Sequence, residues 1–188
     1  MSIFSKLRRG GPASDKERKF RELKAAFRDE DMLLTAKATW LTSRGNWYGS
    51  ASRFDEAVAD FREALTISND HVPARLGLAI ALRETGCLDD ALATLDSIPL
   101  SPPNESESAS VPQHAVLQQY IGVYLLWKDF PTALSYAHRA LAALTDYRRW
   151  LDTAAADLTL AMDSEARSRA EEEAAHLAAL ISELEAQT

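Results

Sequence analysis

One pattern occurs twice at equivalent spacing, in FDEAVADFREAL, from Phe54 to Leu65, and in LDDALATLDSI, from Leu88 to Ile98. Equivalent positions hold residues of similar kind: Phe54 and Leu88, Asp55 and Asp89, Ala57 and Ala91, Phe61 and Leu95. A third copy, FPTALSYAHRAL, begins at Phe130, and the step from Ala91 to its Ala133 is longer than the step from Ala57 to Ala91. The difference indicates an insertion, SPPNESESASVP, at residues 101–112. A fixed period of about 34 residues is typical of repeat arrays, in which each unit packs on its neighbours.

The chain around these copies also has the spacing of helices. Apolar residues recur at intervals of three and four, as at Phe20, Leu23 and Phe27, and no stretch shows the sustained alternation of a strand. We therefore predict an all-α protein. With 188 residues and 46% apolar content, the chain is long enough to form a sizeable core.

The three copies resemble the tetratricopeptide repeat (TPR), a helix-turn-helix unit with small and aromatic residues at set positions. The matching residues are Gly45, Tyr48, Ala57, Phe61, Ala64 and Leu65 in the first copy, Ala79, Gly86, Ala91 and Leu95 in the second, and Tyr124, Phe130, Ala133, Ala140 and Leu141 in the third. The sequence departs from the family pattern at Leu41, where Trp is usual, at Asn69, where Pro usually closes the repeat, and at Gly122, which comes one residue late. The resemblance covers about Ala38 to Leu144.

The resemblance implies an α-α superhelix of about three TPR hairpins, flanked by capping helices. We expect a flexible basic tail at residues 1–13, an N-terminal flanking helix at 14–37, the repeats at 38–144 and C-terminal capping helices at 145–188. Ser14 and Glu17 have the spacing of a capping box, which predicts the start of the flanking helix. A final amphipathic helix is expected after Asp163 or Ser164, with the stripe Ala170, Glu173, Leu177, Leu180, Ile181 and Leu184. This helix could cover the array, pair with itself in a homodimer or dock a partner.

Composition excludes several classes of protein. The formal charge of -7 argues against a nucleic-acid partner, because binding phosphates requires a basic face. No apolar run approaches the roughly 20 residues needed to cross a bilayer. The sequence has a single cysteine, Cys87, which cannot form an intramolecular disulfide, and a cytoplasmic location is expected. The basic residues 1–14 have the charge of a targeting or membrane-surface signal, but a tail is the favoured interpretation.

The sequence has no catalytic or metal-binding signature. It lacks a phosphate-binding Gly-rich loop, a CxxC pair and an HExxH motif, and its four histidines do not have ligand spacing. Cys87 has no evident base and is expected to be a small buried residue. We therefore expect no enzyme activity and no cofactor.

In the TPR family the first helix of each repeat lines a concave groove, so the resemblance implies a protein or peptide segment as partner. The residues expected to bind it are Asn46, Leu76, Ile80, Arg83, Gln118, Gln119, Leu125 and Leu126. Of the side chains with which some TPR proteins clamp a terminal carboxylate, only Asn46 has a counterpart here. Trp47 and Trp127 are expected to pack in the core or a cap. The predicted function is that of an adaptor or scaffold in a protein complex, and the alternative is a small dedicated chaperone or assembly factor.

Overall fold

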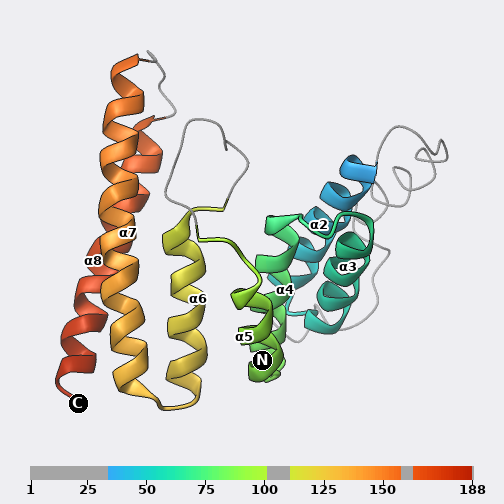
Figure 1. Ribbon diagram of the computed structural model, residues 1–188, viewed down its shortest axis with the longest axis horizontal. Coiled ribbons are helices and arrows are strands. Elements are labelled where there is room, and N and C mark those ends of the chain that lie inside the picture. Colours follow the sequence, from blue (N-terminus) through green and yellow to red (C-terminus); the bar gives the residue numbers. More distant parts are fainter. Residues whose placement is uncertain (1–33, 101–110, 158–162, 188) are drawn as a thin grey trace, which may run out of the picture.

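The computed structural model describes residues 34–100, 111–157 and 163–187, and in these ranges it contains seven α-helices and no strand (Figure 1). The helices are α2 (Leu34–Ser50), α3 (Phe54–Ile67), α4 (Val72–Glu84), α5 (Leu88–Asp96), α6 (Gln113–Leu126), α7 (Phe130–Asp157) and α8 (Asp163–Glu185). The prediction of an all-α fold is confirmed. The predicted tail, most of the N-terminal flanking helix and residues 101–110 of the predicted insertion lie outside the described residues.

The helices form three successive hairpins, α2 with α3, α4 with α5 and α6 with α7, and α8 packs against α7 (Figure 1). The first helices also pack on one another along the array, α2 on α4 and α4 on α6. Within the described residues, the second helices α3, α5 and α7 are farther apart. The first helices therefore form the tighter, inner layer of a superhelix, as the TPR resemblance implies.

The same turn joins the two helices of every hairpin. Ser52, Gly86 and Lys128 have positive φ angles of 58°, 81° and 60°, and they are separated by the same two intervals as the three copies in the sequence. In each turn this residue and the next donate backbone hydrogen bonds to the end of the first helix, as in Gly86 N–H to Arg83 O at 3.0 Å and Cys87 N–H to Leu82 O at 2.9 Å. The three copies thus keep one register across the insertion.

Small residues allow the helices of each hairpin to approach closely. Ala57, Ala91 and Ala133 hold the same position in the three second helices, and each has no exposed surface. In the first hairpin, Arg44 of α2 donates to Asp60 of α3 at 2.6 Å, and this largely buried ion pair adds a polar contact to the apolar packing. A buried pair of this kind fixes the geometry of two helices more than it stabilises them.

The C-terminal part of the fold is a three-helix layer. α7 is one continuous helix, so the boundary that we placed after residue 144 falls inside it. α8 begins at Asp163, where the sequence predicts a start, and buries Ala170, Leu177, Ile181 and Leu184 against α6 and α7. Its other face carries mostly charged, polar and alanine residues, which suits the end of a repeat array.

Two expectations were wrong. Cys87 is exposed, because it stands in the turn at the start of α5 and not in the helix packing. Trp127 is 42% exposed, because it lies at the end of α6, where its ring packs edge-on against that of Tyr124 with 5.7 Å between ring centres.

Candidate binding groove

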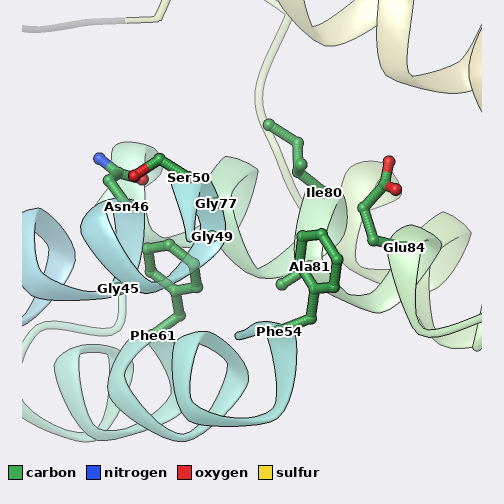
Figure 2. Close-up of a pocket in the computed structure, with 10 residues that line it drawn as sticks. All are labelled: Gly45, Asn46, Gly49, Ser50, Phe54, Phe61, Gly77, Ile80, Ala81 and Glu84. Carbon is green, nitrogen blue, oxygen red and sulfur yellow. The ribbon is translucent and has the colours of Figure 1, made fainter. Parts of the chain in front are cut away.

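Two pockets lie along the layer of first helices. The first lies between α2, α3 and α4 and has a volume of about 270 Å³. Figure 2 shows its arrangement: the rings of Phe54 and Phe61 rise from α3, while α2 and α4 form the opposite walls. The lining residues are Gly45, Asn46, Gly49, Ser50, Phe54, Phe61, Gly77, Ile80, Ala81 and Glu84.

Two glycines set the shape of this first pocket. A Cβ atom added to Gly45 would lie 2.8 Å from the Phe61 ring, and one added to Gly77 would lie 2.4 Å from it. Phe61 therefore fits between α2 and α4 only because neither helix carries a side chain at these points. The result is an apolar pocket whose rim carries the polar side chains of Asn46, Ser50 and Glu84 (Figure 2).

Arg83 forms a polar bridge between the two pockets. Its Nη1 donates to Gln119 Oε1 of α6 at 2.7 Å, and its Nη2 donates to Glu84 Oε1 at 2.6 Å. A Cβ atom on Gly122 would lie 2.5 Å from Arg83 Nη1, so Gly122 provides the room that the guanidinium occupies. This contact gives a physical reason for a glycine at a position where the family pattern does not ask for one.

The second pocket lies between α6 and α8 and has a volume of about 410 Å³. Its lining residues are Gln118, Ile121, Gly122 and Leu125 from α6, and Glu173, His176, Leu177 and Leu180 from α8. α8 therefore extends the groove by one more helix and does not fill it. Four residues of the stripe that could have paired two copies of the chain, Ala170, Leu177, Ile181 and Leu184, are buried within the chain.

Near the start of α6, His114 contacts both α7 and the pocket residue Glu173 of α8. It is 6% exposed, its ring packs on Tyr147 with 5.0 Å between ring centres, and its Nε2 lies 3.4 Å from Glu173 Oε2 of α8. Burial lowers the pKa of His114, and the charge of Glu173 offsets this only in part. The neutral imidazole is therefore favoured at pH 7.

The residues predicted to bind a partner separate into five groups in the structure. Asn46 and Ile80 line the first pocket, Gln118 and Leu125 line the second, and Arg83 and Gln119 form the bridge. Leu76 packs into a cluster between the second and third hairpins. Leu126 is 58% exposed at the end of α6 and lines neither pocket.

The aromatic floor of the first pocket and the α8 wall of the second were not predicted from the sequence. The residues missed include Phe54, Phe61, Gly77, Glu84, Glu173 and His176. One signal was present in the sequence: Asn46 and Ile80 stand one repeat interval apart and so take the same position in successive first helices. Which residues of the other helices face this position depends on the tertiary packing alone.

The side chains of the described residues give these pockets groups that can bind a ligand by apolar contact, hydrogen bonds and charge. They contain no group of three or more His, Cys, Asp and Glu residues placed to hold a metal ion. None of the helices in those ranges combines the length and the apolarity needed to cross a bilayer. What the groove provides is apolar volume, one guanidinium bridge and carboxylates at its rims.

A comparison with known families decides what the helical hairpins are. Residues 50–111, which include α3, α4 and α5, match the family model described as tetratricopeptide repeat. Residues 50–111 carry tetratricopeptide repeats. TPR units generally mediate protein–protein interaction. The third hairpin, α6 with α7, lies beyond the matched range but has the same turn geometry. Neither a curated protein nor a solved structure matches this chain.

Proposed function

We propose that this TPR protein is a non-enzymatic adaptor or scaffold that holds a segment of a partner protein in its groove. The observation that carries the proposal is the pair of apolar pockets on the inner layer, separated by the Arg83 bridge. We further propose that it acts in the cytoplasm, in keeping with a single cysteine in the sequence.

The chemistry of the groove suits a peptide segment with two apolar side chains and a polar group between them. Filling one pocket with a Leu or Phe side chain contributes roughly 1.5–3 kcal/mol before the costs of ordering the segment. The bridge of Arg83 and Gln119 presents hydrogen-bonding groups where the backbone of such a segment would pass. Apolar anchors then supply affinity, and the bridge supplies register and direction.

A pull-down with matched variants tests this proposal. Ile80→Glu places a charge in the first pocket, Leu125→Glu places one in the second, and Ala59→Glu places one on an exposed position of α3 outside both. Tagged full-length chain and each variant are used to capture partners from native lysate, after circular dichroism has shown equal helix content and melting temperature. We expect the two groove variants to lose most of a partner that the Ala59→Glu variant retains.

The opposite pattern overturns the proposal. If folded Ile80→Glu and Leu125→Glu chains capture the same partners at the same level as the Ala59→Glu chain, the groove is not the binding face.

A further inference from the structure

The end of the molecule that holds the first pocket is acidic. The first turns of α3 and α5 lie at this end, and residues 50–56 and 83–90 together contain five carboxylates, Asp55, Glu56, Glu84, Asp89 and Asp90, against two arginines, Arg53 and Arg83. Both arginines already pair with carboxylates of this group, Arg53 with Glu56 and Arg83 with Glu84. An excess of three negative charges remains in these two segments, which contain the pocket residues Ser50, Phe54 and Glu84, and this combination of apolar pocket and acidic turns favours a ligand with apolar and basic side chains.

The chain itself contains such a segment. Residues 1–13, MSIFSKLRRGGPA, combine the apolar side chains of Ile3, Phe4 and Leu7 with three basic residues, Lys6, Arg8 and Arg9, and no acidic one. These residues lie outside the described part of the chain. Their composition complements both the pocket and its acidic surroundings.

We propose that residues 1–13 bind the pocket between α2 and α4 as a tethered ligand and compete there with the partner segment. The apolar side chains enter the space beside Phe54, Phe61 and Ile80, and the basic side chains face the acidic first turns of α3 and α5. This proposal rests on the groove being the binding face, as proposed above.

The connection to α2 is long enough for this contact. Twenty residues, 14–33, join the segment to the start of α2 at Leu34. α2 has 17 residues, so its pocket end lies about 25 Å from its start at a rise of ~1.5 Å per residue. Twenty residues span about 30 Å as a helix and about 66 Å when extended, so the segment reaches the pocket in either form.

Tethering makes a weak contact sufficient. Ion pairs at an exposed rim contribute little individually and are screened by salt. A segment on a short linker, however, has an effective concentration in the millimolar range, so a modest affinity keeps it bound for much of the time. A partner segment must then displace it, which sets a threshold of affinity for capture.

The position of Cys87 allows a direct test in the full-length chain. Cys87 is exposed, is the sole cysteine of the sequence and follows the pocket residue Glu84 by three positions. A nitroxide label on Cys87 broadens the NMR signals of amides that come close to it. We expect the amides of residues 3–9 to lose most of their peak height when the label is paramagnetic and to recover it when the label is reduced. A matched chain with Cys87→Ser and Ala59→Cys carries the label on an exposed position of α3 that does not line the pocket, and should broaden these signals less.

Two variants and one mixing experiment complete the test. Ile80→Glu in the pocket, and Arg8→Glu with Arg9→Glu in the segment, should each restore the signals of residues 3–9 in the Cys87-labelled chain. If the signals of residues 3–9 have the same height with the paramagnetic and the reduced label, the proposal is overturned. Broadening that occurs only when labelled and isotope-enriched chains are mixed also overturns it, because the occupant is then a second copy. Partner capture is measured separately by the pull-down, so a negative result here leaves that proposal untouched.

Discussion

At the scale of single residues, the turn inside each hairpin depends on one residue in the left-handed region. Gly86 adopts this region at no steric cost, whereas Ser52 and Lys128 have a Cβ atom that approaches the following carbonyl oxygen. The first and third hairpins therefore carry a local strain that the second does not. The neighbouring backbone hydrogen bonds keep the turn in place despite it.

Replacing the strained residues should stabilise the protein. Removing a Cβ atom from the left-handed region relieves roughly 1–2 kcal/mol, and the greater freedom of glycine in the unfolded chain offsets roughly 0.4–1 kcal/mol of this. Ser52→Gly and Lys128→Gly should each raise the melting temperature, by up to about 4 °C per kcal/mol gained for a chain of this size. The reverse substitution, Gly86→Ala, should lower it. A lower melting temperature for Ser52→Gly and Lys128→Gly would show that these turns carry no such strain.

The contact of Phe61 with Gly77 is the tightest packing point of the first pocket. Because an added Cβ atom would lie 2.4 Å from the ring, Gly77→Ala should cost about 1–3 kcal/mol by overpacking, more than the roughly 1 kcal/mol that alanine adds to helix stability. Gly49→Ala in α2 is the matched control, since nothing lies within 4 Å of its added Cβ atom. Urea denaturation should show a loss for Gly77→Ala and no loss for Gly49→Ala. Equal stability of the two variants would contradict the packing described.

At the scale of elements, α8 is held to α6 and α7 by an apolar stripe and by polar contacts near His114. Arg148 of α7 donates to Glu171 of α8 at 3.3 Å, and this exposed pair adds little to stability. His114 is different, because it is buried and faces both Tyr147 and Glu173. Its ionisation is therefore coupled to the packing of α8.

Acid should weaken this packing. Burial lowers the pKa of His114 in the folded protein, so below the ordinary histidine pKa of about 6.5 the unfolded chain binds a proton that the folded chain does not. The contribution of His114 to stability is complete above that pH and declines as the pH falls towards the lowered pKa. Urea denaturation between neutral and mildly acidic pH should show this decline, and His114→Gln should reduce it. His176→Gln, at an exposed position of α8, is the control and should leave the decline unchanged. If the full decline persists in His114→Gln, groups other than His114 cause it.

The elements were largely predictable from the sequence, because their periodicity is local. The repeat interval predicts the hairpins, and the residues at Asp163 predict the start of α8. The length of α7 was not predicted, since Leu144, Tyr147 and Leu151 continue one helical stripe past the end of the third copy with no breaking residue between them. The pockets could be predicted only in part: the period places Asn46 and Ile80 together, but the insertion of Phe61 between two helices depends on tertiary packing.

At the scale of the whole molecule, α2, α4 and α6 pack on one another in order, and the two pockets lie between α2, α3 and α4 and between α6 and α8. The polar outer face of α8 ends the array, and its buried stripe stabilises the last hairpin. The proposed binding surface thus includes residues of four helices, α2, α4, α6 and α8, and the charged residues differ between its two pockets. A partner segment that follows this surface would contact α2 and α4 first and α6 and α8 last, or the reverse.

Photo-crosslinking of the complex tests the central proposal, that a partner segment lies in this groove. A small aliphatic residue bearing a diazirine replaces Ile80 in the first pocket, and in a matched chain it replaces Ala59 on the exposed face of α3. Both chains are bound to the captured partner, irradiated and digested, and the crosslinked peptides are identified by mass spectrometry. We expect one continuous segment of the partner to be crosslinked from position 80 and none to be crosslinked from position 59. Crosslinks from position 59 without any from position 80 would contradict it.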